Sequence, residues 1–234
     1  MKKILETLRS KWVEYLLEII VIVIGILGAY ALNNWNEGRK DRVRQESYLK
    51  SLKGDFSKDT LEIRNILKYQ IQDSLMISMY QEKLTDENAS LDDLVRIMVY
   101  DWDPRITILR SFNTNTVEAL VSTGDMNLID SELLNNLANL KNLQEAYISS
   151  SVPFVEFYRN AGNPSIDIPT SLSIINQGPI FEQMIESVDK IAIANKFDRR
   201  LRLKRQAYRN SIRALNKILS ETDAIIALIE QQME

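Results

Sequence analysis

The most constraining feature of the chain is an apolar run that begins directly after Glu18. Every residue from Ile19 to Leu32 is aliphatic, small or aromatic, and asparagines, a tryptophan and charges follow. Along a helix, the outermost aromatic residues of this region would lie about 34 Å apart, close to the spacing of the two interfacial belts of a bilayer. The run therefore predicts a transmembrane helix over residues 13–35. Its expected membrane-interface anchors are Trp12, Tyr15, Tyr30 and Trp35.

Two other interpretations of the run compete with a membrane anchor. A cleaved signal peptide would also begin with basic residues, and Ala29-Tyr30-Ala31 resembles a cleavage site. The long segment before the run, which contains Glu6, Glu14 and Glu18, argues against a signal peptide. A buried helix of a soluble core would tolerate a run of this length, but it would not usually have aromatic and basic residues at both ends. We therefore favour the anchor.

Polar and small residues within the span suggest two kinds of contact. Glu18 lies about one turn inside the span, and we expect its carboxylate to reach toward the nearer interface; the alternative is an intramembrane polar contact with another helix. Gly25 and Ala29, with Gly28 beside them, form a small-residue face that would allow close helix–helix packing.

Two stretches of the sequence carry a family resemblance. The first comprises LLEII, VIGIL and NNWNE between Leu16 and Glu37, and the second is STGDMNLI followed by EL, between Ser122 and Leu133. They resemble the landmarks of a bacterial family of single-span membrane proteins of unknown function. Members often carry a glutamine where this chain has Tyr30. The resemblance implies a single-span envelope protein and implies no activity.

The composition excludes several classes of function. The chain of 234 residues has no cysteine and no histidine. Disulfides, thiolate nucleophiles, iron–sulfur clusters and Ser-His-Asp triads are therefore excluded, and the commonest general base and metal ligand is missing. We expect a protein that is not an enzyme and that holds no cofactor or metal.

Two charged motifs are interpreted as structural. Eight basic residues occur between Lys196 and Arg213, but at helical spacing they spread around the helix, so we expect a solvated surface and no nucleic-acid binding. Asp101 and Asp103 flank Trp102 at a spacing that is poor for one helix face. We expect a helix-ending turn there, closed by Pro104.

Basic residues flank both ends of the span. Because a short basic N-terminus usually stays inside, and long domains are exported largely regardless of such charges, we expect the N-terminus in the cytoplasm. This places the protein in the bacterial cytoplasmic (inner) membrane with a periplasmic domain, and the lack of cysteine fits that location. In the alternative, the domain is cytoplasmic and residues 39–44 contact anionic lipid.

Beyond the span, apolar residues recur at three- and four-residue spacing and predict an all-α fold. The fold is expected to be an elongated helical bundle with long first and last helices. Its parts would be a basic segment over 1–12, the span, and an extramembrane domain over 36–234.

Proline and capping residues set the expected helix bounds. No proline interrupts residues 1–103, so the membrane helix is expected to continue to about Leu84. Ser90 and Asp130 are expected N-caps, and Gly124 an expected C-cap. An irregular loop over about 161–180 would precede a last helix that runs from Phe181 or Ser187 to Gln231, with an inner face that includes Leu201, Tyr208 and Leu215.

These expectations favour a structural or interaction protein over two alternatives. A single span would hold the bundle at the lipid bilayer, where it would contact a protein partner or a second copy of itself. A ligand-sensing helical module that signals through a partner is the alternative, and a carboxylate-based enzyme is the least favoured function.

Overall fold

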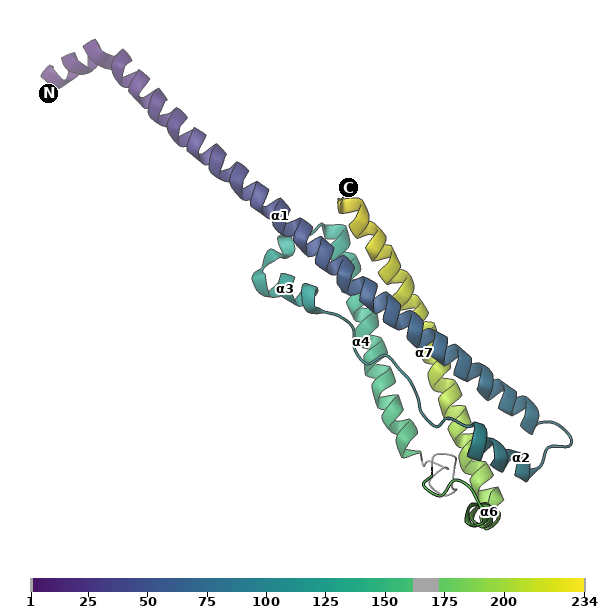
Figure 1. The fold of residues 1–234 in the computed structure, drawn as a ribbon. Helices are drawn as coiled ribbons and strands as arrows, with labels where there is room; N and C mark the ends of the chain where they lie inside the picture. Colours follow the sequence, from purple (N-terminus) through teal and green to yellow (C-terminus); the bar gives the residue numbers. More distant parts are fainter. Residues whose placement is uncertain (1, 162–172, 234) are drawn as a thin grey trace.

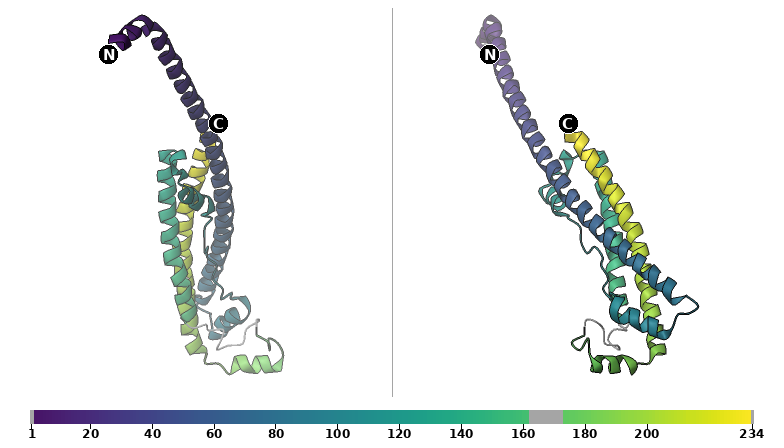
Figure 2. Two further views of the ribbon diagram at one scale, coloured as in Figure 1. Left: turned by 90° about the vertical axis from the view of Figure 1, so that its left-hand side faces the viewer. Right: turned by 45° about the vertical axis from the view of Figure 1, so that its right-hand side comes forward.

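The computed structural model describes residues 2–161 and 173–233, with the side chains of residues 2–11 and of Tyr15 outside that description. The described residues contain no strand, which confirms the all-α fold. Three long helices form the body of the molecule: α1 (Lys2–Leu84), α4 (Ser131–Asn160) and α7 (Lys190–Met233). Because α7 packs against both α1 and α4, it is the central helix of the elongated bundle (Figure 1 and Figure 2).

Helix α1 is unbroken over 83 residues. Its first part projects alone beyond the bundle, and its second part lies along α7 (Figure 1). Gly38 and Gly54 remain helical, and no proline removes a backbone donor. The predicted continuation from the apolar run to about Leu84 is therefore confirmed.

Helices α2, α3 and α4 each begin or end at a predicted capping residue. Ser90 forms a reciprocal capping box with Asp93 at the start of α2 (Leu91–Arg96). Helix α3 (Asn115–Thr123) ends at Gly124, whose φ of 75° is the left-handed conformation that glycine adopts without strain. The Asp130 carboxylate accepts a hydrogen bond from the Glu132 backbone N–H at the start of α4.

Two further helical pieces lie next to these elements. A π-helix follows α2 directly, over Ile97–Asp101, and is designated η1. A 3-10 turn over Asp125–Leu128, designated η2, follows α3.

Of the two predicted starts of the last helix, Ser187 is close to the observed start and Phe181 falls in a separate short helix. Helix α6 (Pro179–Glu186) begins after Gly178, and α7 begins at Lys190. The Asp189 carboxylate accepts from the backbone N–H groups of Ile191 and Ala192, so it caps α7 and ends any continuity with α6. Of the predicted loop over 161–180, residues 162–172 lie outside the described residues.

The core consists of two apolar clusters separated along the bundle axis. The first joins α1, α3, α4 and α7 and includes Phe56, Ile63, Leu120, Tyr147 and Leu215. The second joins α1, η1, α6 and α7 and includes Ile77, Met98, Trp102, Phe181 and Phe197. On α1 the first cluster ends at Leu67 and the second begins at Ile77. A polar stretch of α1 therefore lies between the two cores.

The residues between η1 and α3, which we call the extended segment (102–114), form neither helix nor strand. This segment runs along the bundle and links its two ends (Figure 1). It lies over the polar stretch of α1. Because it has no ladder or helical bonds of its own, its backbone groups need partners from the helices.

Candidate functional site

Side chains from all three long helices hydrogen-bond the backbone of the extended segment. The amide of Gln70 on α1 donates to the carbonyl oxygen of Thr107 at 2.8 Å, and the hydroxyl of Tyr208 on α7 accepts from the Thr107 N–H at 3.3 Å. On α4, the Tyr147 hydroxyl accepts from the N–H of Leu109 at 3.1 Å. These bonds satisfy backbone groups that would otherwise be buried without partners.

Further backbone contacts occur at the two ends of the extended segment. Near its start, the hydroxyl of Tyr158 on α4 donates to the Pro104 carbonyl oxygen at 2.9 Å. Near its end, the Asp59 carboxylate on α1 accepts from the backbone N–H of Asn113 at 3.0 Å. The extended segment is thus attached along its length to the helices that surround it.

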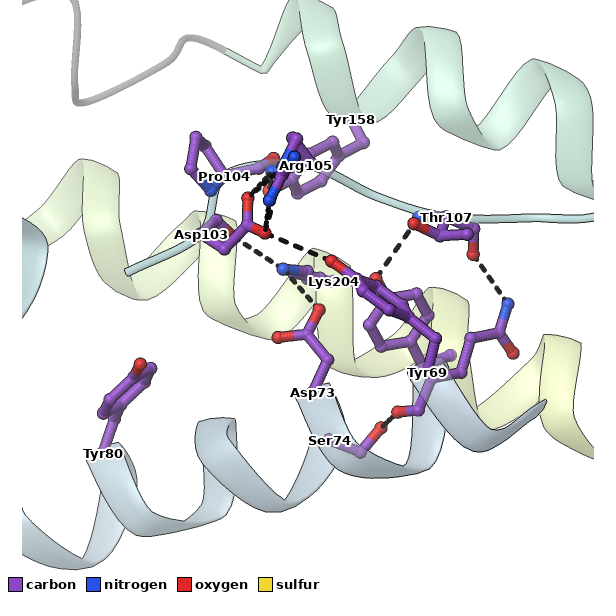
Figure 3. Close-up of polar contacts among 12 residues, drawn as sticks. Tyr69, Asp73, Ser74, Tyr80, Asp103, Pro104, Arg105, Thr107, Tyr158 and Lys204 are labelled. Carbon is purple, nitrogen blue, oxygen red and sulfur yellow. Dashed lines mark hydrogen bonds and ion pairs between the residues drawn. The ribbon is translucent and has the colours of Figure 1, made fainter. Parts of the chain in front are cut away.

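Lys204 lies at the centre of this arrangement (Figure 3). Its side chain is fully buried, and its Nζ lies 2.6 Å from Asp73 Oδ2 on α1. The same ammonium group donates to the backbone carbonyl oxygen of Asp103 at 2.7 Å. It also lies 4.5 Å from the centre of the Trp102 ring, a cation–π contact. One buried cation therefore connects α7, α1 and the extended segment.

Burial and ion pairing have opposite effects on Lys204. Loss of water lowers the pKa of its ammonium group, and the neighbouring Asp73 carboxylate opposes that change; the net direction is downward. The Asp73 side chain is only 13% exposed. Because both charges are shielded from water, removal of either partner would leave the other buried and unpaired.

The Asp103 side chain completes the cluster at the surface of the bundle. It accepts from Arg105 Nε at 2.9 Å and from the Tyr69 hydroxyl on α1 at 3.1 Å. Burial alone would raise the pKa of Asp103, but the hydrogen bonds from Arg105 and Tyr69 outweigh it and lower the pKa to about 2. Asp103 is therefore ionised throughout the physiological range.

A second buried cation lies one turn before Lys204. Arg200 donates to the Tyr158 backbone carbonyl oxygen, and its guanidinium group lies 3.9 Å from the centre of the Tyr158 ring. Burial raises the pKa of the Tyr158 hydroxyl to about 12. This contact joins α7 to α4, whereas Lys204 joins α7 to α1.

We define the Lys204 cluster as Lys204, Asp73, Asp103, Arg105 and Tyr69. A lysine with a lowered pKa beside a carboxylate is a pattern that active sites also use. Here, however, the ammonium group is fully buried and is occupied by Asp73 and a backbone carbonyl. The arrangement can therefore fix the positions of three chain segments, and it presents no lysine surface to a substrate.

The prediction of a solvated basic run was wrong for two of its eight residues. Lys196, Arg199, Arg202, Arg205, Arg209 and Arg213 are exposed as expected, whereas Arg200 and Lys204 are buried. Leu201, predicted on the inner face, is only partly buried. The available signal was the spacing of Phe197, Lys204 and Ser211, which places a lysine on the same face as buried residues.

The structure places the predicted span residues on the projecting part of α1, away from the bundle. Trp12, Glu18, Ala29, Tyr30 and Trp35 are exposed. Apart from their chain neighbours and the nearby backbone of their own helix, no described atom lies within 4 Å of a Cβ built at Gly25 or Gly28. The side chain of Tyr15 lies outside the described residues. The bundle therefore does not bring these residues together with the Lys204 cluster.

The second landmark of the sequence packs against α1 just beyond the span. Asp125 accepts from Arg44 at 3.0 Å and from the Tyr48 hydroxyl at 2.8 Å. In the first landmark, the Asn33 amide donates to Glu37 at 2.9 Å. The second landmark thus lies at the end of the bundle from which the first landmark projects, although the two are far apart in the sequence.

A cleft opens at the opposite end of the bundle, between α1, α2 and α7. It has a volume of about 440 Å³, within the range of small-molecule sites. Its apolar wall is formed by Ile77, Leu84, Leu94, Phe197 and Leu201, and its polar rim by Gln81, Thr85, Asp198, Arg202 and Arg205. In the described residues, no group of three or more Asp and Glu side chains could hold a metal ion.

The fold defines an all-α protein in which one described helix is long and apolar enough to cross a membrane. An 18-residue window of this helix has a mean hydropathy of 2.4, and the rest of the chain buries none of it. The chain belongs to a family of unknown function, DUF6090, whose family model matches residues 18–164. This match fits the uncharacterised family expected from the sequence. Neither the curated proteins nor the solved structures contain a match.

Proposed function

We propose that the protein is a single-pass, membrane-anchored helical component of the bacterial envelope that acts through contacts with other proteins. The observation that carries this proposal is the continuity of α1. One helix contains the exposed apolar window and then forms a wall of the bundle. Because no flexible linker separates the two parts, the bundle is held close to a fixed distance from the bilayer. A bundle held at a fixed distance from the membrane is suited to a structural or interaction role.

The ends of the apolar window support an anchor. Trp12, Tyr30 and Trp35 are exposed at the two ends of the window, where aromatic residues would lie at the two membrane interfaces. The guanidinium group of Arg39 lies 6.0 Å from the centre of the Trp35 ring. An aromatic ring followed by a cation matches the change from the interface to the headgroup region.

N-terminal sequencing of protein extracted from membranes tests the anchor. An uncleaved span retains the residues before Ile19. A mature chain that begins at Leu32 would support cleavage after Ala29-Tyr30-Ala31 and would contradict the anchor.

A reporter fusion tests the orientation separately. We propose that the N-terminus is cytoplasmic and that the bundle is periplasmic. Alkaline phosphatase fused after Glu234 should then be active, whereas a fluorescent protein that folds only in the cytoplasm should stay dark. The reverse pattern would place the bundle in the cytoplasm, where residues 39–44 would meet anionic lipid.

A ligand-sensing module is the second candidate function. The observation that favours it is the cleft between α1, α2 and α7, which combines an apolar wall with charged groups on its rim. In this candidate, ligand binding would change the contact between the bundle and a partner, since signalling would require one.

A further inference from the structure

We infer that the cleft between α1, α2 and α7 binds a medium-chain carboxylate, with its alkyl tail on the apolar wall and its head at Arg205. This inference rests on the proposed membrane anchor and assigns a ligand class to the cleft of the ligand-sensing candidate; it does not depend on the orientation of the span. It rests on the shape of the cleft, the chemistry of its lining and its distance from the bilayer.

The wall of the cleft is suited to an alkyl chain. Phe197 and Ile77 are almost completely buried in the second core, so they support the wall from behind and have little exposed surface of their own. Leu84, Leu94 and Leu201 are partly exposed, and they lie on α1, α2 and α7 respectively. An alkyl chain in the cleft would remove this apolar surface from water at about 25 cal/mol per Å².

The rim of the cleft is suited to an anion. Arg202 is paired with Asp198 at 2.8 Å, so these two charges offset each other. Arg205 instead donates to the neutral amide oxygen of Gln81 at 2.6 Å, and no ion pair to Arg205 is found in the described part of the chain. A carboxylate is a stronger acceptor for a guanidinium group than an amide oxygen. The rim therefore has a net positive charge beside an apolar wall.

The position of the cleft excludes a lipid that stays in the anchoring bilayer. Along α1, Ile77 lies about 63 Å beyond Trp35 at 1.5 Å per residue. A bilayer lipid has no access at that distance, so the ligand must arrive through water. Medium-chain carboxylates are soluble enough to do so, and they combine one alkyl tail with one anionic head.

Photolabelling of the full chain tests this assignment. The protein is held in nanodiscs of phosphatidylcholine and exposed to decanoate that carries a diazirine on its tail, and the labelled residues are mapped by mass spectrometry. We expect saturable labelling of the residues that line the cleft. Unlabelled decanoate should compete with it, and decanol, which lacks the charge, should compete about tenfold less well.

Three variants make the test specific. Arg205→Gln should weaken competition by decanoate about tenfold, because the cationic partner is lost. Arg199 is an exposed arginine on the same helix but outside the cleft, so the control Arg199→Gln should leave the competition by decanoate unchanged. Leu84→Trp should fill the cleft and abolish labelling, with circular dichroism used to verify that the helices remain folded.

Four outcomes would overturn the inference. They are labelling confined to the span, equal competition by decanol and decanoate, unchanged labelling in a folded Leu84→Trp protein, and equal effects of Arg205→Gln and Arg199→Gln. Arg205 is exposed, so its substitution tests the anion contact even if Leu84→Trp fails to fold.

Discussion

Lys204 on α7 and Asp73 on α1 form an ion pair of 2.6 Å at the point where the two apolar cores separate. The pair connects the helix that contains the apolar span to the central helix of the bundle. The same lysine binds the backbone of the extended segment at Asp103. Between the two cores, the packing of α1 against α7 therefore depends on this ion pair and not on apolar contacts.

The first prediction concerns this ion pair. Lys204→Met should destabilise the protein by about 3 kcal/mol, because it leaves the Asp73 carboxylate buried without its partner. Thermal unfolding of the full chain in detergent would measure the loss. The control Arg199→Met removes an exposed cation from the same helix and should change stability by less than about 0.5 kcal/mol.

A double variant separates the ion pair from general packing. Lys204→Met combined with Asp73→Leu removes both charges, so it should recover part of the stability lost in Lys204→Met alone. If the two substitutions were simply additive, the two charges would not be coupled, and the central role of this pair would be wrong.

The second prediction concerns acid stability. The pKa of Asp103 is about 2 in the folded protein, below its ordinary value of 3.8. A lowered carboxyl pKa contributes stability that is complete above the ordinary value and is lost as the pH falls from about 4 to about 2. Because the side chain is about one-third exposed, the contribution should be about 1 to 2 kcal/mol after allowance for solvent screening.

Chemical denaturation at a series of pH values would measure this effect. Asp103→Asn should be less stable than the wild type at pH 7, and the difference should shrink as the pH approaches 2. Asp92→Asn is the control, since Asp92 is exposed and pairs only at the surface with Lys190. A constant difference between Asp103→Asn and wild type at all pH values would contradict the assignment.

The third prediction compares two glycines. Gly54 lies inside α1, and apart from its chain neighbours and the nearby helix backbone no described atom is within 4 Å of a built Cβ, so Gly54→Ala should stabilise the protein by about 0.5 to 1 kcal/mol. Gly124 is also uncrowded, but its φ of 75° strains any residue with a Cβ, so Gly124→Ala should destabilise by about 1 kcal/mol. A higher unfolding midpoint for Gly54→Ala and a lower one for Gly124→Ala would support this prediction. Equal shifts for the two variants would mean that the backbone conformation of the two glycines does not determine the effect of alanine.

The sequence predicted those parts of the fold that depend on neighbouring residues. The length of α1 followed from the lack of proline, and the ends of three helices followed from Ser90, Gly124 and Asp130. Each of these signals is local, because a cap or a proline acts on groups within one turn of itself. The break before α7 depends on Asp189, another local cap.

The Lys204 cluster was missed because its partners are distant in the sequence. Asp73, Asp103 and Lys204 lie on three separate segments, and helical periodicity does not report which faces meet. A lysine is also almost never fully buried unless it is paired, so the default interpretation of the basic run was a solvated surface. The pairing depends on the packing of α1 against α7, which is a tertiary contact.

The fourth prediction is that the span mediates self-association. Gly25 and Ala29 are one turn apart on a part of α1 that the rest of the chain leaves uncovered. In hydrocarbon, helices attract one another mainly through close packing, so Gly25→Leu should hold two spans apart and weaken a dimer. Glu18 lies on the same face, and two facing carboxylates would share a proton, so Glu18→Gln should preserve or strengthen the dimer. Crosslinking in native membranes should show a dimer band for the wild type and for Glu18→Gln, and lose it for Gly25→Leu. A wild-type protein that remains monomeric in membranes, or a Gly25→Leu protein that crosslinks as before, would exclude this interface and leave Glu18 as an interfacial residue.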